Sequence, residues 1–146
     1  MSIYRLDYPL DDTDPIVMPK VNPEKSCIYI FFIEDKGCYV GKSDGRNPKS
    51  RWQKRYSKNV QDMIEGKSWH GDPKKDFRPV HYALFQAVKK KLKVALIISE
   101  NLTGFALLDR EKDLINSIGT LNGRRVKKAK KAVGKKIIET VKAVGV

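Results

Sequence analysis

The sequence predicts a small α/β domain of the α+β type, in which a three-stranded, antiparallel-type sheet is flanked by helices. Two short runs of β-branched and aromatic residues surround an Asp-Lys-Gly turn, which indicates a hairpin. Segments with helical periodicity follow, and a third apolar run separates them. A chain of 146 residues has the length of one domain and can bury a substantial core.

The chain is expected to have three parts: an extended N-terminal arm over residues 1–25, a folded domain over 26–122 and a basic tail over 123–146. The arm carries four prolines and a cluster of aspartates, which disfavour a helix. The tail holds nine basic residues and one acid, Glu139. Two interpretations of the tail stay open: a helix laid along the phosphate backbone of a nucleic acid, or a solvated, partly disordered tail.

The hairpin is expected to consist of strands over 27–33 and 38–42. A three-residue loop, Asp35-Lys36-Gly37, would join them, with the glycine in the left-handed conformation. A loop of this length places residues 34 and 38 opposite each other. Because the loop has an odd number of residues and side chains alternate along each strand, the loop length decides which side chains of the two strands share a face.

Odd-numbered residues of both strands are predicted to share one face of the hairpin. That face carries Cys27, Tyr29, Tyr39 and Gly41, and the glycine leaves open space beside the phenol rings. Cys38 belongs to the other face, so the two cysteines are not expected to form a disulfide. Both faces are apolar, which favours a hairpin inside a sheet that helices cover.

The remaining elements are expected to be a helix over 50–64, a polar loop over 65–79, a helix over 80–91, a buried strand over 93–100 and a helix over 103–118. Ser50 is the expected N-cap of the first helix. Trp52, Tyr56 and Val60 follow at spacings of four, which makes an apolar stripe. The polar loop is longer than most, and such loops are often functional. Its His70 is not interpreted as a ligand; it could contact DNA, but a solvated loop histidine is the preferred interpretation.

The charge of the chain indicates a polyanionic partner. Lysines and arginines number 30 against 17 acidic residues, for a formal net charge of +13. Nucleic acid is the preferred partner, although an anionic membrane surface or charge that serves solubility alone would also fit. The residues expected to contact nucleic acid are Arg46, Lys54, Arg124, Arg125, Lys127, Lys128, Lys130 and Lys131.

The sequence predicts a cytoplasmic protein without a membrane span. Its longest apolar runs, such as 27–33 and 94–99, are too short to cross a bilayer. The first residues lack a basic segment followed by an apolar one, so no signal peptide is expected. Two cysteines are too few for a disulfide framework, which favours a reducing compartment.

Several polar residues occur in an order that resembles the GIY-YIG nuclease family. They are Tyr29 in "CIY", Tyr39 ten residues later in "YVG", Lys42 three residues after it, Arg51 at the start of a helix, Glu111 on a late helix and Asn122 eleven residues further on. The resemblance covers residues 27–122 and includes the expected order of strands and helices.

The chain departs from the family pattern at three places. Cys27 stands where the name motif begins with glycine. The loop before Arg51 is longer than usual, which leaves Arg46 as a rival for the family's arginine. Family members often carry His or Tyr four residues after that arginine, where this chain has Arg55. Tyr56 follows one residue later, about 100° further around an α-helix.

The resemblance implies a role for each residue. Tyr29 would act as the general base or orient the attacking water, Tyr39 would hydrogen-bond the water or the phosphate, Arg51 would contact the scissile phosphate, Glu111 would bind one Mg²⁺ or Mn²⁺ ion, and Asn122 would buttress the site. Gly41, Lys42, Arg55 and Tyr56 would support them. A phenol has a pKa near 10, so Lys42 and Arg51 would have to favour its ionised form.

The predicted function is therefore metal-dependent hydrolysis of DNA phosphodiester bonds by an endonuclease. A homodimer would allow it to cut both strands. The alternative is a nucleic-acid-binding protein that does not cut, either a degenerate nuclease domain or an RNA binder. The set of Tyr29, Tyr39, Arg51 and Glu111 favours the nuclease, because binding alone requires neither a tyrosine pair nor a lone glutamate.

Overall fold

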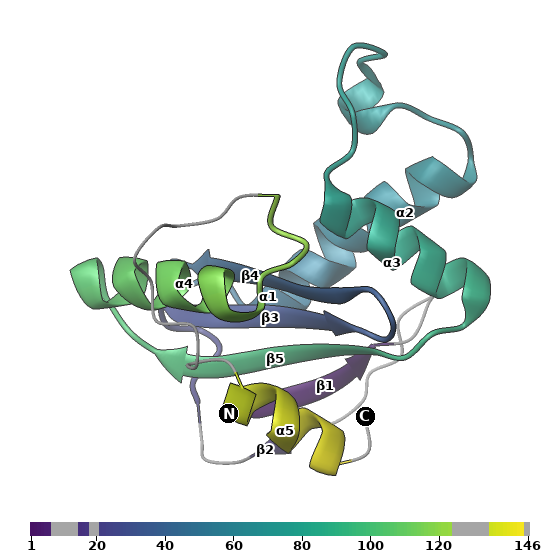
Figure 1. The fold of residues 1–146 in the computed structure, drawn as a ribbon. Helices are drawn as coiled ribbons and strands as arrows, with labels where there is room; N and C mark the ends of the chain where they lie inside the picture. The colour runs from purple at the N-terminus through teal and green to yellow at the C-terminus, as the bar shows by residue number, and fades with distance from the viewer. Residues whose placement is uncertain (7–14, 18–20, 124–134, 145–146) are drawn as a thin grey trace.

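A computed structural model describes residues 1–6, 15–17, 21–123 and 135–144, and it confirms the α+β class (Figure 1). The strands are β1 (Ser2–Leu6), β2 (Ile16–Val17), β3 (Cys27–Ile33), β4 (Gly37–Ser43) and β5 (Val94–Asn101). The α-helices are α1 (Pro48–Arg51), α2 (Ser57–Ile64), α3 (Pro79–Lys90), α4 (Gly104–Ile118) and α5 (Lys135–Ala143).

The sheet is larger than the three strands that the sequence predicts. It has the order β2-β1-β5-β3-β4, all antiparallel, and β2 contributes only two residues. The difference comes from the N-terminal segment, where β1 pairs along its whole length with β5. Ile3 is buried on one face of the sheet, and Tyr4 and Leu6 on the other. The prolines that argued against regular structure lie beyond these five residues.

The hairpin register differs by two residues from the predicted one. Ile33 lies opposite Gly37 and Tyr29 opposite Gly41, so residues 34–36 form the turn. Asp35 adopts a positive φ of 62° in this turn, and the glycine that follows has a φ of 116°. A shift of two preserves the parity of the pairing. The predicted division of side chains between the two faces is therefore confirmed.

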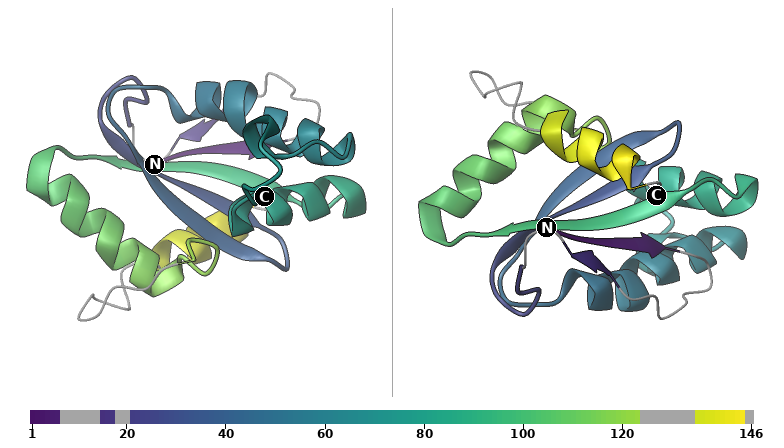
Figure 2. Two further views of the ribbon diagram at one scale, coloured as in Figure 1. Left: turned by 90° about the horizontal axis from the view of Figure 1, so that it is seen from above. Right: turned by 90° about the horizontal axis from the view of Figure 1, so that it is seen from below.

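Helices cover both faces of the sheet (Figure 2). On one face, a core cluster that includes Tyr29, Phe31, Trp52, Tyr56 and Leu84 lies between the sheet and the helices of residues 48–90. On the other face, the strands pack against α4 and α5 through a separate cluster. Cys27 belongs to the first cluster and Cys38 to the second, and both thiols are free, as predicted.

Part of the expected basic tail belongs to the folded domain. Val141 of α5 is fully buried, and Ile137, Ile138 and Val144 pack beside it against the sheet. Lys136 and Lys142 of the same helix are exposed. The longest described helix, α4, has 15 residues, and among the described residues no helix is long and apolar enough to cross a membrane.

The first helical region begins earlier than predicted. Asn47 rather than Ser50 is the N-cap: its side-chain oxygen accepts a hydrogen bond from the Lys49 amide at 3.0 Å. Pro48 occupies the first helical position, where its missing N–H and fixed φ fit a helix start. A single π-helical turn, Trp52–Tyr56, separates α1 from α2.

Candidate active site

A cavity of about 660 Å³ lies beside the tyrosine face of the hairpin. Residues from the helices on both faces of the sheet line it. Glu111 of α4 reaches it from the opposite side of the edge strand β4. Nine of the residues singled out in the sequence line it: Tyr29, Tyr39, Gly41, Lys42, Arg51, Lys54, Arg55, Tyr56 and Glu111. The fold thus brings together residues that are up to 82 positions apart in the chain.

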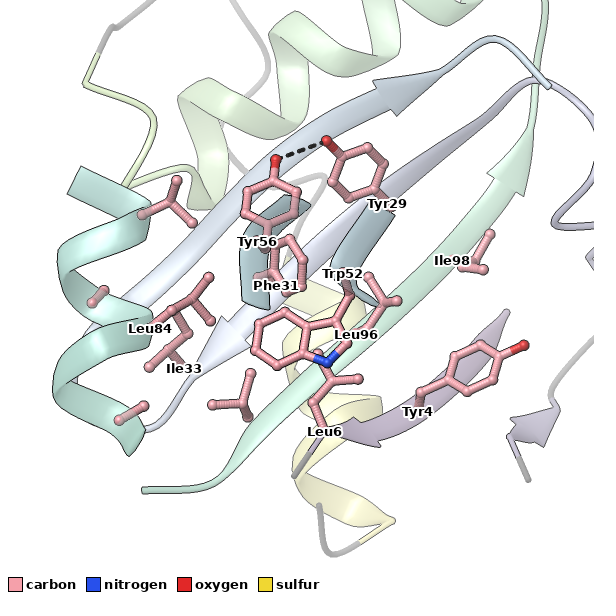
Figure 3. Close-up of a cluster of buried hydrophobic side chains, with 14 of the residues drawn as sticks. Tyr4, Leu6, Tyr29, Phe31, Ile33, Trp52, Tyr56, Leu84, Leu96 and Ile98 are labelled. Atoms are coloured by element: carbon pink, nitrogen blue, oxygen red, sulfur yellow. Dashed lines mark hydrogen bonds between the residues drawn. The ribbon is translucent and has the colours of Figure 1, made fainter. Parts of the chain in front are cut away.

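Three tyrosines form the centre of the cavity wall. The hydroxyl oxygens of Tyr29 and Tyr56 are 3.1 Å apart and share a buried hydrogen bond (Figure 3). The Tyr39 ring lies 6.4 Å from the Tyr29 ring and 6.3 Å from the Tyr56 ring, measured between centroids. Phe31 lies beneath all three and makes an edge contact with Tyr56 at 4.8 Å. These contacts fix the rings within the core.

The π-helical turn explains how Tyr56 reaches this cluster. In an α-helix, Tyr56 would lie about 100° away from the residue four positions after Arg51. The amide of Ser57 instead donates to the carbonyl of Trp52, five residues earlier. Such a turn accommodates one extra residue, so side chains five positions apart lie on one side of it. Arg51 and Tyr56 consequently both line the cavity. The rotation of about 100° that an α-helix would place between Tyr56 and the expected position is absorbed by the π-helical turn.

Gly41 is required by the close approach of Tyr29. The two residues are directly opposite in the β3–β4 pairing. A Cβ atom at Gly41 would lie 2.5 Å from the Tyr29 hydroxyl oxygen and closer still to the ring. Real Cβ contacts are essentially never below 3.0 Å. The open space predicted beside the phenols is thus occupied by the Tyr29 ring itself.

A β-bulge lies beside Tyr29 on its other neighbour, β5. Ile28 pairs with Glu100, whereas Tyr29 pairs with Ile98, so Ser99 has no partner in the ladder. Bulges increase local strand twist and re-aim nearby side chains, and they are frequent next to active sites. Tyr29 therefore lies between a bulge on β5 and Gly41 on β4.

The ionisation of Tyr29 differs from the sequence-based expectation. Burial raises the pKa of Tyr29, and a negative charge on Tyr39 would raise it further. The hydrogen bond with Tyr56 and the nearby Arg51 guanidinium act in the opposite direction but do not outweigh burial. Burial also raises the pKa of Tyr56. In the protein alone, both phenols are therefore neutral at physiological pH.

Arg51, rather than its rival Arg46, belongs to the main cavity. Arg46 lines a separate groove of about 410 Å³, which shares Arg51, Lys54 and Arg55 with the cavity. The Nε atom of Arg51 is buried and has no hydrogen-bond partner among the residues that the structure describes. An unsatisfied guanidinium donor in a basic cavity fits an anionic ligand.

Glu111 brings the cavity a carboxylate from α4. Its side chain is only 7% exposed. A buried carboxylate is a suitable ligand for Mg²⁺, which prefers oxygen and is often held by one or two carboxylates together with water and phosphate oxygens. In the described ranges no group of three or more His, Cys, Asp or Glu side chains could hold a metal ion. The single buried carboxylate of Glu111 fits an ion that keeps most of its waters.

Asn122 does not line the cavity but supports the strand that carries Tyr39 and Gly41. Its side-chain oxygen accepts from the Val40 amide at 2.9 Å, and its Nδ2 donates to the Val40 carbonyl at 2.7 Å. The Leu121 amide donates to the Cys38 carbonyl at 2.9 Å. Because β4 is an edge strand, these bonds satisfy backbone groups that a further strand would otherwise pair.

Several lining residues carried no assigned role in the sequence. They are Lys58, Asn59, Asp62, Trp69, His70, Arg78 and His81. Trp69 and His70 belong to the long loop that the sequence marked as a candidate functional segment. Arg78 gave no signal, because it stands in an aperiodic stretch before a proline. His81 is buried on α3, and only its fold context reveals that it lies near the cavity.

His81 anchors the start of α3 behind the tyrosines. Its Nδ1 accepts a hydrogen bond from the Arg78 amide at 3.2 Å. An accepting Nδ1 requires that the neutral ring carry its proton on Nε2. Burial and the positive Arg78 lower the pKa of His81 to about 4. The ring is therefore a neutral structural group at physiological pH.

Comparisons with protein-family models, with curated proteins and with solved structures found no significant match to the chain. The site itself therefore carries the functional conclusion. It combines phenols, guanidinium groups and a carboxylate around one basic cavity, which is chemistry suited to a phosphate group. The predicted basic residues Arg124, Arg125, Lys127, Lys128, Lys130 and Lys131 lie outside the described residues.

Proposed function

We propose that the protein is a divalent-metal-dependent endonuclease that hydrolyses DNA phosphodiester bonds, as its resemblance to the GIY-YIG nucleases implies. One observation carries this proposal: Tyr29, Tyr39, Arg51 and Glu111 come from four separate elements and line a single cavity. Taken singly, each of these residues could have an ordinary structural role, such as a buried strand tyrosine or a charged residue on a helix. Their convergence on one basic cavity is what a phosphodiester hydrolase requires.

In this mechanism, Tyr29 first loses its phenol proton to solvent, and the resulting phenolate oxygen takes a proton from the attacking water. Arg51 stabilises the ionised phenol by its charge, and Tyr56 donates a hydrogen bond to it. Arg51 also binds the non-bridging oxygens of the scissile phosphate, where its unsatisfied Nε supplies a donor. Tyr39 orients the water or the phosphate. Lys42 adds positive charge where the transition state becomes more negative.

Glu111 would hold the divalent ion in the cavity that Tyr29 and Tyr39 also line. A bound divalent ion polarises the phosphate and stabilises charge on the leaving oxygen. The further contribution of the chain is positional, because Asn122 fixes β4 and Gly41 lets the Tyr29 ring lie across it.

Plasmid nicking tests the proposal. Supercoiled DNA incubated with the protein and Mg²⁺ is expected to give nicked circles, or linear DNA where paired subunits cut both strands, and EDTA is expected to prevent both. Glu111→Gln should abolish Mg²⁺-dependent cutting while DNA binding persists, since a carboxamide is a poorer ligand for a hard cation. Asp109→Asn, on an exposed position of the same helix, is the matched control. Equal cutting by Glu111→Gln would refute the role of Glu111.

A nucleic-acid-binding protein that does not cut is the second candidate. The raised pKa of Tyr29 favours it, because a buried neutral phenol is a poor base. This candidate predicts DNA binding without Mg²⁺-dependent products from either the wild type or any tyrosine variant. The plasmid assay therefore separates the two functions.

A further inference from the structure

The cavity has a second wall that the proposed mechanism does not use. Arg78, Trp69 and His70 line it on the side of α3 and the loop that precedes that helix. None of these residues belongs to the set that the sequence assigned to catalysis. The inference drawn from them rests on the proposed function, because it concerns the DNA that would occupy the same cavity.

Arg78 is held at both its backbone and its side chain. Its amide donates to His81 Nδ1 at 3.2 Å, where the residue is the N-cap of α3. Its Nη1 donates to the Tyr39 hydroxyl at 3.4 Å, and its guanidinium carbon lies 5.6 Å from the centre of the Tyr39 ring and 6.0 Å from that of Trp69. These contacts direct a cation at the tyrosine cluster from the side of Tyr39.

Two guanidinium groups therefore flank the three tyrosines. The charge of the Arg51 guanidinium interacts with the Tyr29 phenol, whereas the charge of Arg78 interacts with the phenols of Tyr39 and Tyr56. The ion pairs Lys67–Glu65 and Arg110–Glu100 do not involve Arg78, and within the described part of the chain no carboxylate pairs with Arg78. A guanidinium that faces phenols and no carboxylate keeps its charge available to a phosphate.

Aromatic rings accompany this cation. The Trp69 and His70 rings stack with centroids 4.7 Å apart and planes inclined by 29°. The Trp69 ring also makes an edge contact with His81 at 5.5 Å, which ties it to α3. Aromatic faces within a basic groove are the means by which proteins bind single-stranded nucleic acid, because every base presents a π-face.

We propose that Arg78 and the stacked Trp69–His70 pair form a subsite for the nucleotide next to the cleaved bond. Arg78 binds the phosphate of that nucleotide, and the aromatic pair stacks against its base. A base can reach these rings only when it is unstacked from its neighbours. The substrate class is accordingly DNA that is single-stranded or locally unpaired beside the cut, rather than continuous duplex.

The phosphate part is tested by the salt dependence of binding to a single-stranded oligonucleotide in EDTA, where no cutting can occur. Removing one phosphate contact lowers the slope of log K against log salt by about 0.7 for a single strand. Arg78→Ala should show this decrease, whereas Arg78→Lys should keep the slope. Lys90→Ala, exposed at the other end of the same helix, should leave it unchanged. An unchanged slope for Arg78→Ala, with a lower melting temperature, would make Arg78 a support for Tyr39 only and overturn the inference.

The base part is tested by tryptophan fluorescence. The chain has two tryptophans, and Trp52 is only 2% exposed, so Trp69 is the one that can report on a stacked base. A single-stranded oligonucleotide should quench the wild-type signal, and an all-abasic strand of the same length should not. Trp69→Phe should remove the quenching yet bind within about threefold of the wild type, and Trp69→Ala should bind about tenfold more weakly. Equal quenching by the abasic strand, or full affinity of Trp69→Ala, would overturn the inference.

These measurements are independent of cutting. A wild-type protein that nicks plasmid but shows neither effect retains the proposed function and loses the nucleotide subsite. A wild-type protein that never nicks but shows both effects loses the proposed function and retains the subsite as a binding site. With nicking established, a preference for DNA with an unpaired base beside the cut over uniform duplex would support the substrate class, and equal rates on both would contradict it.

Discussion

The hydroxyl oxygens of Tyr29 and Tyr56 lie 3.1 Å apart inside the protein, although 27 positions separate the two residues in the chain. One hydrogen bond needs one donor, so only one of the two phenol hydrogens lies between the oxygens. Were Tyr29 to ionise, Tyr56 would have to be that donor. The pair therefore allows Tyr56 to stabilise a charge on Tyr29 by donating a hydrogen bond to it.

Phenylalanine substitutions should separate the two tyrosines. Tyr29→Phe keeps the ring and is expected to lower the nicking rate by about a hundredfold or more, the scale of a lost general base. Tyr56→Phe removes only a supporting hydrogen bond and should lower the rate less, by about tenfold. Each should lower the free energy of unfolding by about 1–3 kcal/mol, because its partner hydroxyl is left unsatisfied.

Melting curves and nicking rates on the same samples check this prediction. Tyr82→Phe is the matched control, because Tyr82 is 47% exposed on α3 and should change neither quantity. A Tyr29→Phe protein that cuts at a rate near that of the wild type would exclude Tyr29 as the base.

Gly41→Ala should act through Tyr29. The added methyl group would overlap the Tyr29 ring, so the variant is expected to lose about 1–3 kcal/mol of stability and most of its activity. The loss should shrink in a Tyr29→Leu background, where no ring crosses the strand. Chemical denaturation of the two single variants and the double variant gives the coupling energy. Strict additivity would show that the alanine acts through something other than Tyr29.

Local rules were enough to predict the hairpin faces but not all of the site. The faces follow from the alternation of side chains, which survives a shift of two residues in register. The position of Tyr56 relative to Arg51 was not predicted, because a period of 3.6 was assumed where the chain forms a π-helical turn. β1 was missed because its pairing with β5 depends on a strand about 90 residues away. Arg78 belongs to a loop without periodicity, so only the fold brings it to the cavity.

The two thiols should be unreactive in the folded protein. Burial raises the pKa of Cys27 to about 11 and that of Cys38 to about 12. At pH 8 the thiolate fraction of Cys27 is then about one in a thousand, and the thiolate is the reactive species. Iodoacetamide is expected to label both residues slowly until denaturant unfolds the chain, as intact-mass measurements would show. Rapid labelling of native protein, or a mass two daltons lower after oxidation, would contradict the burial of these thiols on opposite faces.

The buried His81 should make the protein less stable in mild acid. Its pKa is about 4 in the folded state and near 6.5 in the unfolded chain, because burial and Arg78 disfavour the charged ring. Below pH 6.5 the unfolded state binds a proton that the folded state does not. The stability contributed by the neutral ring is therefore complete above pH 6.5 and decreases until pH 4, by about 1–3 kcal/mol.

His81→Asn isolates this effect from the carboxylates that titrate in the same range. Asparagine keeps an acceptor for the Arg78 amide but cannot titrate. Whatever stability the variant has at pH 8, its free energy of unfolding should fall less steeply than that of the wild type between pH 6.5 and 4, as urea denaturation at each pH would measure. His70 also lies near the ring, so His70→Asn should be measured beside it, and that variant is expected to keep most of the slope. Parallel pH curves for the wild type and His81→Asn would show that His81 gains its proton as readily in the folded protein as in the unfolded chain.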